Sequence, residues 1–203
     1  MMKHLDSRNF FETDEQFANF RPLILADRKS TRIFRSASAF NDMYGRAETV
    51  RKIMSKRHIQ SVLDLTVLRC SYLSDKFNYE LVELIKRKLV ESDQPCIIQC
   101  DAGKKRTGFA CIVLESLSGS DYKNVVADYL ESYKNNNGID LSNNTVLIQR
   151  IIHRQIEPKL RFIAGDNKSS DTVNNLKEDA CNYFLRFGMG YKDIERLQEA
   201  LLK

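Results

Sequence analysis

One short stretch of the chain carries residues that could hold and attack a tetrahedral anion. Residues 96–108 read CIIQCDAGKKRTG, in which Arg106 follows Cys100 by six positions and Thr107 comes next. Apolar residues precede Cys100 and a helix-like run begins at Thr107, so the backbone N–H groups between them can surround an oxyanion. A thiolate at the base of such a loop is a nucleophile. The stretch therefore predicts a phosphate pocket with Cys100 at its base.

Each residue type in this loop suits a part of phosphoryl chemistry. Arg106 presents a planar fork that can hold two phosphate oxygens, which lysine cannot do. Gly103 permits the backbone angles that turn amides inward, and the Thr107 hydroxyl can donate to the sulfur when the sulfur leaves. Gly108 is expected to let the following helix pack closely on the sheet. The substrate-binding residues predicted here are Asp101, Ala102, Gly103, Lys104, Lys105 and Arg106.

The complete pattern is more specific than its cysteine and arginine alone. With five cysteines and 16 arginines in 203 residues, a bare Cys-x5-Arg is expected about 0.4 times by chance. Requiring also Gly103, Thr107 and Gly108 lowers the chance to roughly one in ten thousand. A buried structural cysteine beside a solvated arginine is therefore the weaker explanation.

The loop resembles the phosphate loop of the cysteine-based phosphatases, His-Cys-x5-Arg-Ser/Thr. More narrowly, it resembles the bacterial-type atypical tyrosine and dual-specificity phosphatases, whose loop reads His-Cys-x-x-Gly-Lys-Asp-Arg-Thr-Gly. The resemblance implies a phosphotyrosine-phosphatase-like α/β fold and hydrolysis of phosphomonoesters through a cysteinyl-phosphate, with Cys100, Arg106 and Thr107 as catalytic residues. Further similar stretches are Asn19-Phe20-Arg21, Arg35-Ser36-Ala37, Val62-Leu63-Asp64-Leu65 and the run from Ala180 to Leu202.

Two residues depart from the pattern of that family. Gln99 stands where the family has the histidine before the cysteine, which removes one hydrogen-bonding partner of the thiolate loop. Lys105 stands where the family has the loop aspartate that is thought to protonate the leaving oxygen. The general acid is therefore missing from its expected place.

Three other aspartates are candidates for the acid, because a phenolate whose conjugate acid has a pKa of about 10 needs a proton to leave readily. Asp75 is the first choice, since it lies 25 residues before Cys100 in a polar segment where related phosphatases carry a mobile acid loop. Asp101 adjoins the nucleophile, although its negative charge opposes thiolate formation. Asp64 ends an apolar strand, where it can orient the loop instead.

Three alternatives for the function follow from these residues. The resemblance favours phosphotyrosine in proteins. Lys104 and Lys105 place two ammonium groups at the loop, which could reach the additional phosphates of a phosphoinositide. Gln99 and Lys105 also allow a phosphate-binding module with little turnover, although binding alone does not require the thiol of Cys100.

Alternating strand and helix patterns predict an α/β fold with a central, mostly parallel sheet flanked by helices. Ligands then bind beyond the carboxyl ends of the strands, where Cys100 falls. Strands are expected at residues 32–35, 59–65 and 96–99, and helices at 48–56, 77–90 and 107–117.

The chain after Gly119 is expected to be helical and to belong to the same domain. Its elements are a helix that Ser120 caps and that runs through Tyr133, a turn at residues 135–138, a long helix from Ser142 to Phe162, a polar loop at 165–171 and two closing helices. Pro158 is expected to end or kink the long helix.

Length and composition indicate one phosphatase domain over residues 1–203, with 1–18 as an uncertain lead-in and 120–203 as its helical part. A hydrophobic content of 42% can supply a core without disulfides, and the five cysteines show no zinc spacing. We expect no metal and no cofactor. Cys70, Cys96 or Cys111 could pair with Cys100 under oxidation, although simple packing is the favoured account.

The remaining expectations concern partners and location. The net charge of +5 is dispersed among acidic residues, so we expect no nucleic-acid partner. No secretory signal or membrane-spanning run is apparent, which predicts a cytoplasmic protein with at most peripheral membrane contact. Delivery into a host cell is an alternative location. The expected partner is a phosphotyrosine protein or a phosphoinositide, and the oligomeric state is not specified.

Overall fold

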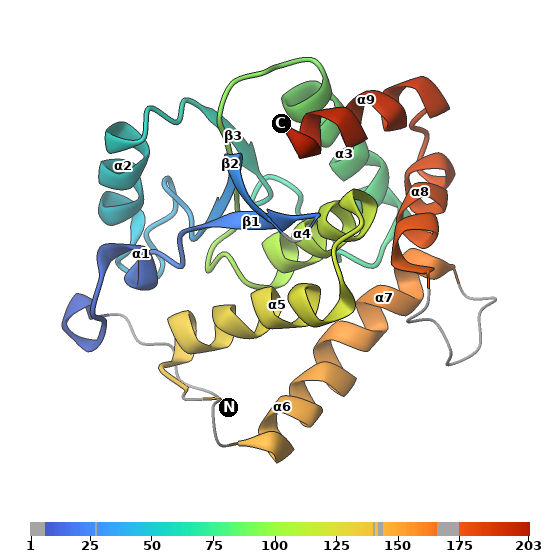
Figure 1. The fold of residues 1–203 in the computed structure, drawn as a ribbon. Helices are drawn as coiled ribbons and strands as arrows, with labels where there is room; N and C mark the ends of the chain where they lie inside the picture. Colours follow the sequence, from blue (N-terminus) through green and yellow to red (C-terminus); the bar gives the residue numbers. More distant parts are fainter. Residues whose placement is uncertain (1–6, 27, 140, 142–143, 166–174) are drawn as a thin grey trace.

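The chain folds around a four-stranded sheet whose strands lie in the order β1-β2-β4-β3 (Figure 1). The computed structural model describes residues 7–26, 28–139, 141, 144–165 and 175–203. β4 is parallel to both of its neighbours, whereas β1 is antiparallel to β2. This mostly parallel sheet with flanking helices confirms the predicted fold class. The strands are β1 (Arg21–Leu25), β2 (Arg28–Ser36), β3 (Ser61–Asp64) and β4 (Cys96–Gln99).

Helices cover both faces of the sheet, with α2 on one side and α4 on the other (Figure 1). They are η1 (Arg8–Phe10), α1 (Asp14–Phe17), α2 (Ala47–Lys56), α3 (Asp75–Ile85), η2 (Lys86–Val90), α4 (Lys105–Ser118), α5 (Tyr122–Asn137), α6 (Thr145–Ile151), η3 (Ile152–Ile156), α7 (Glu157–Ala164), α8 (Leu176–Arg186) and α9 (Tyr191–Leu202). Within the described part of the chain, no helix is both long and apolar enough to cross a membrane.

The central strands are apolar on both faces because each face packs against helices. In β4, Ile97 joins a small cluster with residues of α2 and of the segment after α1, whereas Ile98 joins the main core together with α3, α4, α8 and α9. Neighbouring side chains of a strand point to opposite faces, so a strand buried on both sides reads as a continuous apolar run. The short apolar run at 96–98 therefore indicates the strand that ends at Gln99, directly before Cys100.

The antiparallel strand β1 was not predicted from the sequence. Pro22 lies within it, and the pairing with β2 shifts register between Pro22 and Ile24. Because proline cannot donate to a ladder, it is found on edge strands, and β1 lies at the edge of the sheet. Because Pro22 is unfavourable within a strand, the sequence pattern of residues 21–25 did not indicate β1.

The predicted strands and the first three helices are confirmed to within a few residues, but two details of the helical half are wrong. Asp121, and not Ser120, caps α5, because its side chain accepts from the amide of Lys123. α5 also continues through Asn137, so residues 135–137 are helical and no turn forms there. The helix ends at Gly138, whose left-handed backbone (φ 61°) is the conformation that favours glycine.

The long helix predicted up to Phe162 exists, and Pro158 does not end it. α6, the π-helical segment η3 and α7 follow one another without a break, and Pro158 sits in the first turn of α7. The π-helical segment η3 ends two residues before Pro158 and interrupts the regular α-helical hydrogen bonding there, so the proline does not stop the helix. Ser142 and residues 166–171 lie outside the described residues.

Gly108 allows a close approach, though to a helix instead of the sheet. A Cβ atom at this position would lie 2.5 Å from a ring carbon of Tyr129, which belongs to α5. The sheet is approached less closely, since the same Cβ would lie 3.6 Å from Nη2 of Arg35 in β2. Gly108 fixes the distance between α4, which begins beside the nucleophile, and α5.

Candidate active site

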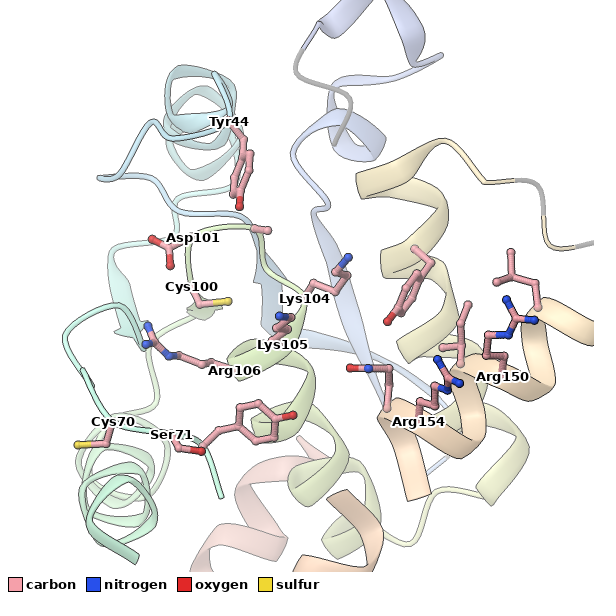
Figure 2. A pocket seen from close by; sticks show the side chains of 16 residues that line it. Tyr44, Cys70, Ser71, Cys100, Asp101, Lys104, Lys105, Arg106, Arg150 and Arg154 are labelled. Atoms are coloured by element: carbon pink, nitrogen blue, oxygen red, sulfur yellow. The ribbon is translucent and has the colours of Figure 1, made fainter. Parts of the chain in front are cut away.

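The residues predicted to do chemistry meet at the carboxyl end of β4. Cys100 directly follows this strand, and α4 begins at Lys105. Cys100 and Arg106 line the same open cavity of about 890 Å³ (Figure 2). The segment 100–106, called here the Cys100 loop, also contributes Asp101, Ala102, Lys104 and Lys105 to the lining.

Gly103 packs against Ser36 of β2 and does not line the cavity. Its φ of +63° lies in the left-handed region, and a Cβ there would come within 2.2 Å of the carbonyl oxygen of Ser36. Its amide donates to the carbonyl of Cys100 over 3.1 Å, which closes a tight turn. Both the backbone angle and the lack of space require glycine.

The carbonyl groups of the loop are held on the side away from the cavity. The amide of Ser38 donates to the carbonyl of Asp101 over 3.3 Å. The Asn19 side chain donates to the carbonyls of Ala102 (3.3 Å) and Gly103 (2.9 Å). Because the N–H of a planar trans peptide points away from its C=O, these bonds turn the amides of Ala102 and Lys104 the other way. Among the described residues, neither amide donates to a protein acceptor.

A buried group of charges holds this carbonyl side in place. Arg35 donates to the carbonyl of Gly103 over 2.9 Å and also pairs with Asp128 of α5. Arg21 pairs with the other carboxylate oxygen of Asp128 at 2.6 Å, and both arginines donate to the hydroxyl of Ser132. The side chains of Arg35 and Asp128 are 0% and 3% exposed. We call Arg21, Arg35 and Asp128 the arginine–aspartate cluster.

The cluster carries its negative charge on Asp128. Burial opposes ionisation of Asp128, but Arg21 and Arg35 more than offset it and lower the pKa of this carboxyl group. Burial and the nearby Asp128 raise the pKa of Glu115, which lies in the same region, well above its usual value. Asp128 is therefore the anion that neutralises the two buried guanidinium groups.

The cations of the loop differ in how firmly they are held. Lys104 is buried, with its Nζ 4.5 Å from the ring centre of Tyr133 and 3.1 Å from Oδ1 of Asn137. Burial lowers the pKa of Lys104 to about 8, and the charges of Lys105 and Arg46 act in the same direction. Lys105 is exposed, and Arg106 donates from Nη1 to the carbonyl of Leu65 over 3.3 Å.

Gln99 and Thr107 are both buried next to the nucleophile. The Gln99 side chain accepts from the amide of Ala39 over 3.0 Å, so it ties the loop to the chain after β2. The hydroxyl of Thr107 has no hydrogen-bond partner among the described residues. The first turn of α4 therefore contains a buried hydroxyl that is not committed to another described residue.

The three candidate acids lie in different places. Asp101 lines the cavity, and its Oδ1 accepts from the side chain of Asn41 at 2.5 Å. Asp75 is the exposed first residue of α3 and is not part of the cavity lining. Asp64 accepts from the amide and the hydroxyl of Thr66 and does not line the cavity either. Of the three, the structure brings only Asp101 to the nucleophile.

The opposite wall of the cavity contains residues that the sequence reasoning missed. Arg150 and Arg154 line it from α6 and η3 (Figure 2). Their spacing of four residues places them on one helix face, but the same spacing is common on solvated helix surfaces. Nothing in the sequence showed that this face looks toward Cys100.

The cysteines considered for redox pairing are all free in this structure. Cys96 and Cys111 are buried, and burial raises the pKa of both thiols. Cys70 lines the cavity, although its sulfur points away from Cys100 in Figure 2. The role of these thiols in redox control stays a prediction.

The arginine–aspartate cluster leads to a test of stability. Asp128→Asn leaves two buried guanidinium groups without their anion, which we expect to lower the free energy of unfolding by about 3–5 kcal/mol. The matched control is Asp93→Asn, because Asp93 also pairs with an arginine but its side chain is 83% exposed. That change is expected to cost less than about 1 kcal/mol. Urea unfolding measures both, and equal losses would contradict the assigned role of Asp128.

Comparison with known proteins agrees with this geometry. The sequence model of a family described as the tyrosine phosphatase family matches residues 71–203. The match includes the Cys100 loop, α4 and the wall that carries Arg150 and Arg154. A search of curated proteins found no match. Because the family match covers more than half of the 203 residues, the chain belongs to the tyrosine phosphatase family.

Proposed function

We propose that this chain hydrolyses phosphomonoesters, with phosphotyrosine side chains of proteins as substrates, through a cysteinyl-phosphate intermediate. The observation that carries the proposal is the presence of Cys100 and Arg106 in one cavity at the start of α4. The loop amides of Ala102 and Lys104 point away from the bonded carbonyl side and can bind phosphate oxygens.

In the first step, the Cys100 thiolate attacks phosphorus in line with the leaving oxygen. The S–P bond forms while the ester P–O bond breaks, and an acid protonates the departing phenolate. Arg106 and the loop amides hold the equatorial oxygens as negative charge redistributes over them. The amides need little reorganisation, because Asn19 and Arg35 already fix the loop.

In the second step, water attacks the cysteinyl-phosphate and the S–P bond breaks. The carboxylate that gave up its proton now accepts one from the water. The hydroxyl of Thr107 can donate to the departing sulfur, since it has no other partner among the described residues. The products are inorganic phosphate and the regenerated thiolate.

We assign the proton transfer to Asp101 in preference to Asp75. Asp101 lines the cavity beside Cys100, whereas Asp75 lies outside the lining at the start of α3. The hydrogen bond from Asn41 orients the Asp101 carboxyl group. Asp75 could act only if the segment before α3 moved toward the loop. Its role as the acid therefore depends on such a movement.

Phosphoinositides are the second candidate substrate, because Lys104 and Lys105 both line the cavity. Their ammonium groups could bind the additional phosphates of an inositol ring. If they do, Lys105→Ala should lower turnover of phosphoinositide vesicles about tenfold and leave the hydrolysis of phosphotyrosine peptides nearly unchanged. Phosphate release from both substrates, measured side by side, decides between them. An equal loss on both substrates would remove the assigned role of Lys105 in reading inositol phosphates.

The covalent intermediate gives the most direct test of the enzyme. Cys100→Ser is expected to abolish turnover of phosphotyrosine peptides while inorganic phosphate still binds, because the amides and Arg106 remain. The wild-type protein, quenched in acid during turnover, should show a phosphorylated Cys100 by mass spectrometry. Turnover at the wild-type rate in Cys100→Ser would rule out the mechanism. Phosphate binding without any trapped intermediate in the wild type would identify a binding module instead.

The acid can be found by varying the leaving group. Asp101→Asn is expected to lower turnover of phosphotyrosine peptides about 10²–10⁴-fold. 4-Nitrophenyl phosphate should lose far less, because its phenolate leaves without a proton. Asp75→Asn is the matched control and should change both rates less than about threefold, since this exposed residue lies outside the cavity lining. A loss confined to poor leaving groups in Asp75→Asn would contradict the assignment and place the acid there.

A further inference from the structure

The cavity around Cys100 is strongly and asymmetrically cationic. Among the residues that the structure describes, its lining contains five basic side chains and a single acidic one, Asp101. Three of the basic residues belong to the Cys100 loop and suffice for one phosphate. The other two, Arg150 and Arg154, lie across the cavity on the long helix formed by α6, η3 and α7 (Figure 2).

These two arginines face the cavity without protein partners. Both are exposed, and neither forms an ion pair or a hydrogen bond with any described residue. The nearest acid along their helix, Glu157, is 3.0 Å from the ring of His153. By contrast, Arg21 and Arg35 each form several hydrogen bonds with other residues. Two unpaired guanidinium groups four residues apart can hold one phosphate by several charge-assisted hydrogen bonds.

The backbone at this wall is also unusual. Arg154 lies in η3, a π-helical segment at residues 152–156 between two α-helices. Such insertions are rare and often occur at functional sites. Here five residues of the long helix reach the cavity: Leu147, Arg150, Ile151, Arg154 and Gln155.

Apart from its charged residues, the cavity is lined largely by apolar and aromatic side chains. Tyr133, Leu147 and Ile151 line it, together with Tyr72. Aromatic and aliphatic side chains suit the side chains of a peptide, whereas a hydroxyl-rich ring calls for polar groups in this position. The lining therefore favours a peptide as the molecule that spans from the Cys100 loop to the arginines.

We propose that Arg150 and Arg154 form a second anion subsite, which binds a phosphorylated side chain close to the phosphotyrosine that is hydrolysed. The enzyme then prefers doubly phosphorylated peptides over singly phosphorylated ones. This inference rests on the proposed function, because it names the substrate class of the same site. The second phosphate is bound and not cleaved.

The preference can be measured with matched peptides. Each contains one phosphotyrosine and, one to three residues to either side, a serine or a phosphoserine. In the wild type we expect kcat/KM to be about tenfold higher for the best phosphoserine peptide than for its serine counterpart. In the double variant Arg150→Ala/Arg154→Ala this ratio should fall close to one. The matched control is Arg161→Ala, which removes a charge from an exposed position of the same helix outside the cavity lining. It should keep the ratio.

Binding separates a failure of this subsite from a failure of the proposed function. Cys100→Ser should bind the phosphoserine peptide about tenfold more tightly than the serine peptide by fluorescence anisotropy, and adding the two arginine substitutions should abolish the difference. If this result appears without any wild-type turnover, the subsite stands and the proposed function fails.

Three results would overturn the subsite. The first is an equal affinity for the two peptides, and the second is a preference that survives in the double variant. The third is an arginine-dependent gain that appears only with inositol polyphosphates, tested as soluble head groups and in vesicles, which would replace the peptide as the occupant.

Discussion

The ion pairs between Asp128 and the guanidinium groups of Arg21 and Arg35 are the interaction on which this site depends. Burying two guanidinium groups next to a phosphate pocket is costly unless an anion accompanies them. Asp128 supplies that anion from α5, and Arg35 can then bind the carbonyl of Gly103 from behind the loop. The loop thus gains a rigid back side made of charge-assisted hydrogen bonds. Its front side, with the amides and Cys100, faces the cavity.

The part of the site that the sequence predicted is the part that is local. Strand β4, the Cys100 loop and the first turn of α4 are contiguous, so the order of residues places Cys100 and Arg106 in one pocket without any knowledge of the rest. The role of Gly103 was predictable for the same reason, because its left-handed backbone is a requirement of the loop itself. The sheet followed from the apolar runs of its parallel strands. β1 was not predicted, because the proline at position 22 is unfavourable in most strands.

The other parts of the site depend on contacts between segments that are distant along the chain, and no local sequence pattern indicates such contacts. Asn19 and Arg35 reach the loop from 84 and 68 residues away, and Asp128 meets Arg35 across 93 residues. The stretches around Asn19 and Arg35 resemble the phosphatase family, but the resemblance did not show that these side chains bind the Cys100 loop. Asp75 was chosen by its distance along the chain from Cys100, but its position as the first residue of α3 keeps it outside the cavity lining. Arg150 and Arg154 looked like an ordinary solvated helix face.

Lys105 and Asp101 carry opposite charges on the two sides of the Cys100 loop. Lys105 brings a positive charge to the position where the family has an aspartate, and the one carboxylate of this loop is that of Asp101, directly after Cys100. Asn41 donates to the Asp101 carboxyl group and offsets part of its charge. The loop therefore presents a carboxylate on one side of Cys100 and the cations Lys105 and Arg106 on the other, which is the arrangement that our proposal of Asp101 as the acid uses.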